Sequence, residues 1–583
     1  MAKNFEIKIN GKKYKASSDD TILQIAKKNN LKIPTLCHHP DLPASANCRL
    51  CLVEIAFAEN NRVVTACSTK ASEGMEVRLD TKKVKLSRKL NLEMLLSDHI
   101  KKCPDCNWLD NCELKKLAEE FGIKNSRFTE RRRHFKIDAK TPSIFWDSSK
   151  CIECGNCVSA CNEIAGLSNI ESKYRSHSII FGPVGGKSFA DTDCIFCGQC
   201  VVHCPAGSLQ EKSSILPVKK LLEKKNKKDV LIAQFAPSTR YSIGELFGEP
   251  AGKNLEYKLV TALKKLGFDY VFDVNFGADI TTLEEAAELE ERLQTKRDGP
   301  MFTSCCPAWV RYVETFHHDL IPHLTSTKSP THCLAAAIKT YFSKKIKVGS
   351  SRIKIVEIMP CIAKKYEATL SEMRIGLLPE IDFALTVREM AKILKDEKID
   401  LPKLEDSEFD SPLGQSSGAA AIYGSSGGVM ESALRTLVAK IGKSEMPRLE
   451  FGQIRGMDGI KESSVDIDGE ILEIAAVSGL KNAGKLIAEI KSGVKRYDYI
   501  EVMACPGGCL GGGGQPIPTT PEIRAQRSAA YYTDDQGKEI RRAHENPDII
   551  KMYQGLDSKP MSRKAKKLFH RKFRIRKPKL SKK

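Results

Sequence analysis

Apolar and polar residues alternate with the two-residue period of β-strands at the start of the chain. Residues 5–9 and 12–16 form two such runs on either side of an Asn-Gly pair, which is typical of a type I′ hairpin turn. Helical spacing of apolar residues follows over 21–28, and Asp20 is the expected N-cap of this helix. A hairpin followed by a helix predicts a β-grasp ferredoxin fold.

The second half of the chain has a different pattern, in which continuous apolar runs alternate with helical stretches. The apolar runs have the length and composition of strands buried on both faces, and they cover residues 230–235, 300–302, 353–358 and 498–502. Apolar residues recur with a helical period over residues 257–266, 282–294, 387–394 and 428–438. This alternation predicts an α/β architecture with mostly parallel sheet.

Length and composition indicate a protein of several domains. The chain has 583 residues, too many for one core, and 41% of them are apolar, as in an ordinary soluble protein. No run approaches the ~20 apolar residues that cross a bilayer, and residues 1–6 do not begin a signal peptide. We therefore expect no membrane span and a cytoplasmic location.

The formal charge of +20 is concentrated at the C-terminus. Residues 558–583 hold thirteen Lys or Arg and no Asp or Glu, so the rest of the chain carries only +7. A few apolar side chains accompany these charges, namely Leu568, Phe569, Phe573 and Ile575. We expect a solvated basic tail or a docking site for an acidic electron carrier, rather than nucleic-acid or membrane binding.

Twenty-one cysteines form tight groups, unlike the cysteines of a small secreted disulfide scaffold. Metal thiolate sites in a reducing compartment fit this grouping. Zinc is the alternative for any single Cys-x2-Cys pair, whereas the spacing of the whole groups favours iron–sulfur clusters. Cys333 stands apart from these groups. We expect Cys333 to be a small buried apolar residue.

The first group consists of Cys37, Cys48, Cys51 and Cys67, with gaps of ten, two and fifteen residues. This spacing differs from the C-x4-C-x2-C pattern of plant ferredoxins. It is similar to the [2Fe–2S] module at the start of large hydrogenases and of a subunit of respiratory complex I. We expect one [2Fe–2S] cluster here, with zinc as the alternative.

A histidine joins three cysteines in the second group, whose members are His99, Cys103, Cys106 and Cys112. A lone histidine is more often an ordinary surface or core residue, but this one supplies the fourth ligand that the cysteines lack. The same spacing is found in the two families just mentioned. A [4Fe–4S] cluster with one imidazole ligand is predicted, and the neutral imidazole makes such a cluster less negative.

A clear internal repeat follows, in which a Cys-x2-Cys-x2-Cys-x3-Cys run occurs twice. This pattern is typical of bacterial ferredoxins with two [4Fe–4S] clusters, where the fourth cysteine of each run binds the other cluster. The first predicted ligand set is therefore Cys151, Cys154, Cys157 and Cys204. The second set is Cys194, Cys197, Cys200 and Cys161.

Three further cysteine segments each follow a predicted strand in the second half of the chain. They are TSCCPAW at 303–309, MPCIAKK at 359–365 and EVMACPGGCLGGGGQP at 501–516. In open α/β folds, ligands collect beyond the carboxyl ends of the strands. Three strand ends can therefore bring these thiols to one point, which is the candidate active site.

These segments resemble the three signature segments of the [FeFe]-hydrogenases, and the resemblance extends over roughly residues 1 to 555. In that family four cysteines hold the H-cluster, a [4Fe–4S] cubane joined to a diiron unit. The ligands that the motifs imply are Cys306, Cys361, Cys505 and Cys509, with Cys509 bridging the two parts. Met359 and Met503 match residues that line the diiron unit. Lys364 matches the lysine that hydrogen-bonds one of its cyanide ligands.

The resemblance also implies a proton relay made of Cys305, Glu285, Thr325 and Glu288, with Arg292 near its surface end. Glu285 and Glu288 lie three residues apart on a predicted helix and hence on one face. Without the resemblance, these glutamates and Lys364 would be interpreted as solvated surface residues. Thr325 stands where the family more often has serine, and it keeps the hydroxyl group.

The implied reaction is the reversible reduction of two protons to H2. The implied cofactors are one [2Fe–2S] cluster, three accessory [4Fe–4S] clusters and the H-cluster, which needs maturation proteins. Electrons are expected from ferredoxin or from flavin-containing NAD(P)-linked subunits. Two other classes stay open: a non-catalytic relative in hydrogen sensing or iron–sulfur assembly, and an electron-transfer subunit like that of complex I. The relay residues argue against the first, and the three segments after residue 300 argue against the second.

These predictions define a multidomain protein of α+β and α/β units. In chain order they are a β-grasp [2Fe–2S] ferredoxin domain (1–80), a [4Fe–4S] domain with one histidine and three cysteine ligands (81–140), a two-[4Fe–4S] ferredoxin domain (141–215), an α/β catalytic domain with mostly parallel sheets (225–520), a small-subunit-like C-terminal segment (521–557) and the basic tail (558–583).

Overall fold

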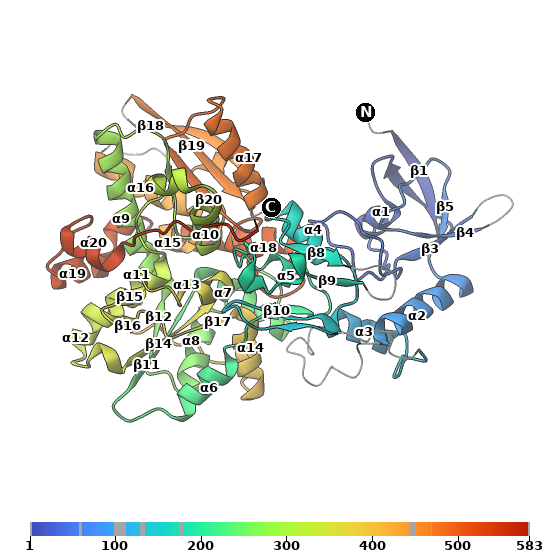
Figure 1. Cartoon of the computed structure of the whole chain (residues 1–583), viewed down its shortest axis with the longest axis horizontal. Helices are drawn as coiled ribbons and strands as arrows, with labels where there is room; N and C mark the ends of the chain where they lie inside the picture. The colour runs from blue at the N-terminus through green and yellow to red at the C-terminus, as the bar shows by residue number, and fades with distance from the viewer. Residues whose placement is uncertain are drawn as a thin grey trace.

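The computed structural model describes residues 3–56, 61–97, 99, 112–128, 135–173, 179–441, 450–467 and 469–580. A five-stranded N-terminal sheet lies at one end of the long axis, and two four-stranded sheets with many helices around them lie at the other (Figure 1). A cysteine-rich unit of short helices and strands lies between them. Within the described ranges, no helix is long and apolar enough to span a membrane.

The N-terminal sheet has five strands in the order β2-β1-β5-β3-β4. Its elements are β1 (Asn4–Ile9), β2 (Lys12–Ser17), α1 (Ile22–Lys28), β3 (Leu52–Ala56), β4 (Arg62–Thr65) and β5 (Glu76–Arg78). β1 pairs antiparallel with β2 and parallel with β5. The hairpin prediction is confirmed, because Asn10 and Gly11 have positive φ angles of 47° and 81°, as a type I′ turn requires.

The prediction that Asp20 caps α1 is wrong. Thr21 is the N-cap: its hydroxyl accepts a hydrogen bond from the N–H of Gln24, and the Gln24 side chain accepts one from the N–H of Thr21. This reciprocal capping box satisfies two backbone donors at once, which a single cap residue does not do. Asp20 instead pairs with Lys28, with 2.8 Å between Oδ1 and Nζ.

The cysteine-rich unit contains α2 (Lys82–Leu96), α3 (Glu113–Glu120), β6 (Ile137–Asp138), β7 (Ile144–Asp147), α4 (Asn156–Glu163), β8 (Ile170–Lys173), β9 (Ile180–Pro183), α5 (Gln199–Val202) and β10 (Leu209–Glu211). The two repeated cysteine runs fold alike. Gly155 before α4 and Gly198 before α5 both adopt left-handed backbone conformations, with φ of 80° and 79°. A Cβ at Gly198 would lie 2.7 Å from the Ile362 side chain, so this loop touches the larger unit closely.

The larger unit contains two separate four-stranded sheets. The first is fully parallel, in the order β12-β11-β14-β17, with strands Tyr270–Asp273, Val230–Phe235, Ile353–Met359 and Phe383–Thr386. The second has the order β13-β20-β19-β18, with strands Met301–Phe302, Tyr499–Met503, Glu470–Ser478 and Ile460–Ile467. Only β18 runs antiparallel to its neighbour. Mostly parallel pairing is confirmed, although it is divided between two sheets.

The helices around these sheets include α6 (Ile215–Glu223), α7 (Pro237–Ser242), α8 (Glu256–Lys265), α9 (Val274–Gln294), α10 (Pro307–Phe316), α11 (Pro330–Ala337), α13 (Ala363–Glu367), α14 (Val387–Asp396), α15 (Gly418–Ala421), α16 (Gly428–Ile441) and α17 (Leu480–Lys491). The first half of α9 packs into the core of the first sheet, and the second half packs into the core of the second sheet. The helix begins at Val274, well before the predicted 282. Its first turns are buried on all sides and show no amphipathic stripe.

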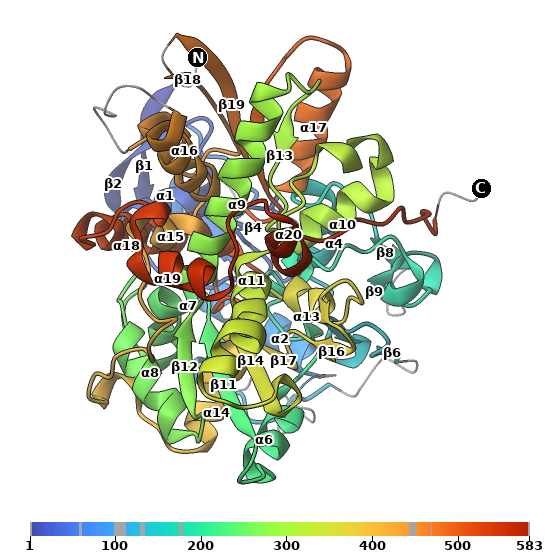
Figure 2. The same ribbon diagram turned by 90° about the vertical axis from the view of Figure 1, so that its left-hand side faces the viewer.

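The C-terminal segment contains α18 (Pro521–Gly537), α19 (Pro547–Gly555) and α20 (Arg563–Phe569). α20 packs on α11 (Figure 2), where the Phe569 side chain is fully buried. The charges beyond it pair with acidic residues of the body: Arg576 lies 2.6 Å from Glu314, and Arg574 lies 3.1 Å from Glu372. The prediction of a solvated tail is therefore wrong for residues 558–580.

The C-terminal segment also contacts the two N-terminal units. Arg524 of α18 donates two hydrogen bonds, of 2.6 and 2.7 Å, to the carboxylate of Asp41 beyond the first cysteine. The backbone N–H of Lys579 donates to Asp193, which immediately precedes the second cysteine run. One short segment thus joins parts of the chain that are hundreds of residues apart.

We expect Phe569→Ala to lower the free energy of unfolding by about 3–5 kcal/mol, because it leaves a cavity in the core shared with α11. Ile575→Ala is the matched control in the same tail, since its side chain is 69% exposed. Denaturant unfolding of both variants measures the difference. Equal stability of the two variants would contradict the packing of the tail.

Candidate active site

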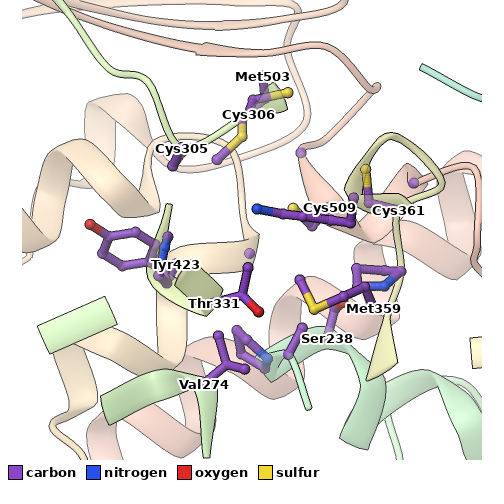
Figure 3. A pocket seen from close by; sticks show the side chains of 18 of the residues that line it. Ser238, Val274, Cys305, Cys306, Thr331, Met359, Cys361, Tyr423, Met503 and Cys509 are labelled. Atoms are coloured by element: carbon purple, nitrogen blue, oxygen red, sulfur yellow. The ribbon is translucent and has the colours of Figure 1, made fainter. Parts of the chain in front are cut away.

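Five cysteines line one pocket between the two sheets of the larger unit (Figure 3). Cys305 and Cys306 follow β13, Cys361 follows β14, and Cys505 and Cys509 follow β20. The structure thus brings together the three cysteine segments, as the positions of the strand ends predict. β14 belongs to one sheet, and β13 and β20 belong to the other. The thiols therefore meet between the carboxyl ends of strands from two different sheets. The empty space in the pocket amounts to about 730 Å³, part of which is open to solvent.

Backbone forms part of the pocket wall, because glycines bring chain segments unusually close. A Cβ at Gly512 would lie 2.3 Å from the carbonyl oxygen of Pro360. Gly508 has a φ of 85°, and a Cβ there would lie 2.8 Å from the carbonyl oxygen of Gly424. Any larger residue would fill this cradle or displace its neighbours.

The pocket disfavours uncompensated thiolates. Burial raises the pKa of the Cys306 thiol and raises that of Cys361 to about 12, and neighbouring cysteines add to the shift at Cys361. Burial likewise raises the pKa of Cys505 well above its ordinary value. Only a cationic centre makes several thiolates stable in such a place. The donor set and the glycine cradle therefore fit a metal cofactor held by thiolates.

Lys364 lies inside the pocket wall and is only 5% exposed. Its Nζ lies 2.6 Å from Oε2 of Glu367. Burial alone would lower the pKa of this lysine, but the carboxylates of Glu367 and Glu357 outweigh it and raise the pKa. The interpretation as a surface lysine is thus wrong, and the side chain presents a buried cation. Met359 and Met503 supply apolar lining.

A buried carboxyl group lies next to the fifth cysteine. Burial raises the pKa of Cys305 well above its ordinary value, and nearby Glu285 raises it further. Glu285 is itself 1% exposed; burial raises its pKa to about 8, although a 2.7 Å hydrogen bond from the Tyr499 hydroxyl opposes that shift. Its Oε2 finds no hydrogen-bond partner among the described residues. Both groups therefore hold a proton at neutral pH.

The second carboxylate of the predicted relay lies about one turn further along α9. Glu288 accepts hydrogen bonds of 2.9 Å from the Thr325 hydroxyl and 2.9 Å from the backbone N–H of Ser326. Arg292 approaches it to 3.9 Å and donates to the carbonyl of Pro322. Glu285 and Glu288 are both buried, so the interpretation as solvated surface residues is wrong.

Sequence reasoning missed Tyr499 and Ser326. Tyr499 is an aromatic residue with a polar tip in the buried strand β20, and such a hydroxyl usually has a partner. A tyrosine in a predicted buried strand was therefore the sequence signal that could have identified Tyr499. Ser326 follows Thr325 directly, but nothing in the local pattern indicates that its side chain turns toward Glu288.

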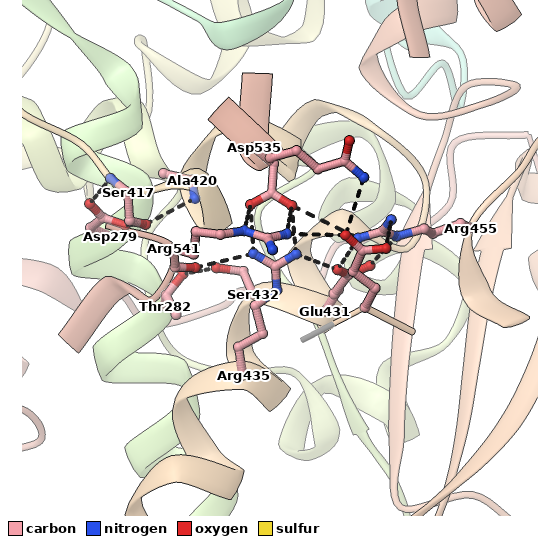
Figure 4. Close-up of polar contacts among 12 residues, drawn as sticks. Asp279, Thr282, Ser417, Ala420, Glu431, Ser432, Arg435, Arg455, Asp535 and Arg541 are labelled. Atoms are coloured by element: carbon pink, nitrogen blue, oxygen red, sulfur yellow. Dashed lines mark hydrogen bonds and ion pairs between the residues drawn. The ribbon is translucent and has the colours of Figure 1, made fainter. Parts of the chain in front are cut away.

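Hydrogen bonds hold the helices behind the pocket together (Figure 4). Arg435 of α16 is fully buried and donates to Asp535 of α18 at 2.8 Å and to Glu431 at 2.6 Å. On the other side, Asp279 of α9 accepts hydrogen bonds from the backbone and hydroxyl of Ser417 at the start of α15. A buried pair of this kind is costly to break from one side, so it fixes the relative positions of these helices.

The cysteines of the N-terminal unit lie close together in two pairs. The backbone N–H of Cys48 lies 3.5 Å from Sγ of Cys37, and this neighbour lowers the pKa of Cys37 to about 5. Cys51 and Cys67 interact in the same way. All four side chains are buried, and none of the nineteen cysteines in the described ranges forms a disulfide.

The repeated runs lie as the crossover pattern predicts. Burial raises the pKa of Cys154 well above its ordinary value, and Cys204, Cys157 and Cys151 add to that shift. Cys204 thus lies with the first run. Burial also raises the pKa of Cys197, and its cysteine neighbours are Cys194, Cys161 and Cys361. The second set therefore lies beside the candidate active site.

The histidine group is only partly described, because Cys103 and Cys106 lie outside the described residues. His99 and Cys112 are both 5% exposed. Nδ1 of His99 donates to the carbonyl of Lys150 at 3.1 Å, which leaves the lone pair on Nε2. This is the tautomer in which histidine usually binds a metal.

Five cysteines line one pocket, and the second repeated cysteine run lies beside it. This arrangement defines an iron–sulfur oxidoreductase. Five family profiles match successive parts of the chain: a 2Fe-2S iron-sulfur cluster binding domain (2–82), the NADH-ubiquinone oxidoreductase-G iron-sulfur binding region (88–127), a 4Fe-4S dicluster domain (150–208), the iron only hydrogenase large subunit, C-terminal domain (229–513) and the iron hydrogenase small subunit (521–576). The chain belongs to the [FeFe]-hydrogenases, the iron-only hydrogenases.

Relatives match over nearly the full length. The chain is 38% identical to the NADP-reducing hydrogenase subunit HndD of Solidesulfovibrio fructosivorans, covering 97% of this chain and 98% of that protein. It is 39% identical to iron hydrogenase 1 of Clostridium pasteurianum, covering 97% and 99%. A solved structure of [FeFe]-hydrogenase HydA1 from Chlamydomonas reinhardtii aligns with a TM-score of 0.57 at 36% identity, covering 62% of this chain and 99% of that one. An H-cluster catalytic domain with accessory iron–sulfur domains is confirmed.

Proposed function

We propose that this chain interconverts two protons and two electrons with H2 in the pocket between the two sheets. One observation carries the proposal: five cysteines meet there beside a buried series of proton-carrying groups that begins at Glu285. A non-catalytic sensor or assembly protein has no need of such a series. An electron-transfer subunit would use residues 1–210 and leave the pocket without a role.

In this proposal Cys306, Cys361, Cys505 and Cys509 would hold the H-cluster, because all four line the pocket. When bound, the cofactor supplies a low-potential iron with an open position for hydrogen. Lys364 presents its ammonium group to anionic ligands on the diiron unit, since Glu367 holds it charged inside the wall. Met359 and Met503 keep water away from that position.

Protons pass between the pocket and the surface along α9. The Cys305 thiol holds a proton at the pocket, and Glu285, with its pKa of about 8, exchanges protons near neutral pH. Glu288 lies on the same face of the helix, about 5–6 Å away between Cβ atoms. Thr325 orients its carboxylate, and Arg292 stabilises its charge near the outer end.

Electrons reach the pocket through one [2Fe–2S] and three [4Fe–4S] clusters. His99 with Cys103, Cys106 and Cys112 would hold the cluster that has a histidine ligand. One packed group contains Cys37 and Cys48 of the first cysteine group, Cys112 of the histidine group and Cys154 of the first repeated run. This packing supports two electron-input routes, one from each of the first two groups, that meet at the first cluster of the repeat. The residues that would hold the second cluster of the repeat lie beside the pocket, because Cys197 neighbours Cys361.

The electron partner in this proposal is a set of flavin-containing NAD(P)-linked subunits. This is supported by the similarity to the NADP-reducing hydrogenase subunit HndD over nearly the full length. Direct exchange with ferredoxin is the alternative. The β-grasp sheet order at the N-terminus supports a [2Fe–2S] domain that receives the electrons. Dedicated maturation proteins assemble the H-cluster.

The test is hydrogen evolution by anaerobically matured protein with reduced viologen and with reduced ferredoxin. We expect H2 with viologen, which needs no docking site. H2 with ferredoxin at comparable rate would favour the direct partner over NAD(P)-linked subunits. Fully cluster-loaded protein that evolves no H2 with either donor would place the chain with the sensors or assembly proteins.

Tyr499→Phe is expected to move the alkaline limit of hydrogen evolution upward by about one pH unit. The Tyr499 hydroxyl stabilises the ionised form of Glu285, so its loss raises the pKa of that carboxyl above its present value of about 8. Glu285 then keeps its proton to higher pH. Rates measured across a pH series report this shift.

Tyr241→Phe is the matched control, because Tyr241 is also buried and donates to a carboxylate, Asp534, at 2.7 Å. Its pH profile is expected to match that of the wild type. If Tyr499→Phe had an unchanged or lowered alkaline limit, Glu285 would not be the group that sets it.

A further inference from the structure

A chain of hydrogen bonds continues beyond Glu288 into the C-terminal segment. The Ser326 hydroxyl lies 3.0 Å from Oε2 of Glu288 and 2.7 Å from Nδ1 of His570. Nε2 of His570 lies 3.0 Å from Oε2 of Glu284, on the same helix α9. Side chains from three separate parts of the sequence thus form one continuous path.

The position of His570 is fixed by the backbone around it. The carbonyl of Phe569 accepts a 2.7 Å hydrogen bond from the N–H of Lys328, and the N–H of Arg571 donates to the carbonyl of Ser326 at 2.8 Å. His570 therefore sits in register with the segment that carries Ser326. Its side chain is 5% exposed, less than the 11% of the Glu288 side chain.

Charged groups lie near His570 on several elements. Glu284 and Glu288 face it from α9, directly or through Ser326. Lys328 and Arg571 are its nearest cationic neighbours along the flanking segments, and the Lys328 ammonium pairs with Glu380 and the Leu568 carbonyl instead. Tyr553 donates to the other oxygen of Glu284.

The hydrogen-bond directions define two states that differ by one proton position. Glu284 already accepts from the Tyr553 hydroxyl and the N–H of Met561, so Nε2 of His570 carries the hydrogen of their contact. In one state, protonated Glu288 donates to Ser326, whose hydroxyl donates to Nδ1. In the other, Nδ1–H donates to the Ser326 oxygen, whose hydrogen points to the Glu288 carboxylate.

Passing between these states moves one proton without any oxidant or reductant. The Glu288 O–H bond breaks, the Ser326 oxygen gains that hydrogen and gives up its own, and an N–H bond forms at Nδ1. The result is a carboxylate and an imidazolium, and the reverse sequence returns the proton. Arg292, the other neighbour of Glu288, stays protonated at all relevant pH values and cannot perform this exchange.

We infer that His570 exchanges a proton with Glu288 through Ser326, as a further station of the relay. This inference rests on the proposed hydrogenase function. It gives the C-terminal segment a part in the reaction as well as in packing. Histidine suits the task because it is the side chain that ordinarily changes charge between pH 5 and 8. His570 acts through Glu288 and Ser326 and is thus a positioning and relay residue.

The test compares His570→Gln with His318→Gln. Glutamine can keep hydrogen bonds at position 570 but cannot carry the proton. His318 is a matched control, because its Nε2 also binds the tail, at the carbonyl of Arg576, 3.0 Å away. The holoenzymes are assayed for exchange of H2 with D2O and for hydrogen evolution from reduced viologen. Infrared spectra record the carboxyl band of Glu288.

We expect His570→Gln to slow both reactions by roughly tenfold at neutral pH. This is smaller than the roughly 10²–10⁴-fold rate loss on removing a sole acid–base group, because Glu288 keeps some contact with solvent. The Glu288 carboxyl band should also shift, because the hydrogen-bonded path from Glu288 through Ser326 to position 570 is altered. His318→Gln should match the wild type in all three measurements. Equal behaviour of the two variants at every pH overturns the inference.

If His570→Gln fails to acquire its clusters, Ser326→Ala is the variant that tests the inference. It removes the hydroxyl that links Glu288 to His570 and leaves the histidine in place. A slow, loaded Ser326→Ala enzyme supports the inference, and wild-type exchange rates overturn it. If the wild type itself evolves no H2, the proposed function fails. The infrared comparison still tests the inference in that case. If the Glu288 carboxyl band has the same position in His570→Gln as in the wild type, the hydrogen-bonded path is contradicted. A shifted band supports the path.

Discussion

Replacing Cys305 with serine is expected to lower hydrogen evolution by roughly 10²–10⁴-fold while the iron content stays level. The Cys305 thiol lines the pocket and lies beside Glu285, and burial holds it protonated. A serine hydroxyl has nearly the same shape but gives up its proton far less readily than a thiol. The variant should therefore bind the cofactor and fail in proton transfer.

Iron analysis and turnover with reduced viologen measure these two properties separately. Cys333→Ser is the matched control, because Cys333 is fully buried, lies outside the pocket lining and keeps its contact with the Lys328 carbonyl through the new hydroxyl. It should show full iron content and activity. Turnover in Cys305→Ser equal to that of this control would remove the thiol from the proton path.

Replacing Cys361 with alanine is expected to abolish hydrogen evolution through loss of the cofactor. The cubane would lose one of four thiolate ligands in a pocket where burial disfavours every remaining thiolate. Loss of the cubane removes about four iron atoms per chain and with them the attachment of the diiron unit. The accessory clusters should remain, since they have their own ligand sets.

The measurement is iron and sulfide content together with electron paramagnetic resonance of the reduced protein. Signals of the accessory clusters should persist in Cys361→Ala, while H-cluster signals vanish. Cys333→Ala provides the matched control and should retain all signals. A Cys361→Ala protein with unchanged iron and turnover would show that the cubane is held elsewhere.

The cysteine groups and the strand ends that carry them were predictable from the sequence. The cysteine groups follow from the short spacing between their cysteines, and the strands follow from short continuous runs of apolar residues. Three segments were expected to meet at one point, and they line one pocket. The division into two sheets was not predictable, since β14 and β20 show the same apolar run and their strand neighbours depend on the whole chain. Sequence reasoning also placed Glu285 and Glu288 on one helix face.

Tertiary packing explains what sequence reasoning missed. The first turns of α9 are buried on all sides, so the hydrophobic pattern contains no helix signal there. The basic tail has the composition of a solvated segment, but its charges meet Glu314 and Glu372, which are hundreds of residues away. His570 has no local motif; its role follows from contacts with Ser326 and Glu284 that only the folded chain provides.

The pairing of Asp41 with Arg524 has a consequence for how the protein is made. Domains of a growing chain fold in order from the N-terminus, so the first cysteine unit is complete long before α18 leaves the ribosome. Its contacts with residues 112–154 can form early, but its ion pair with Arg524 awaits one of the last helices to be synthesised. A ribosome that stops before residue 524 therefore releases chains whose first unit folds but lacks this tie. Synthesis of the final segment therefore adds the last of the contacts that hold the first cysteine unit.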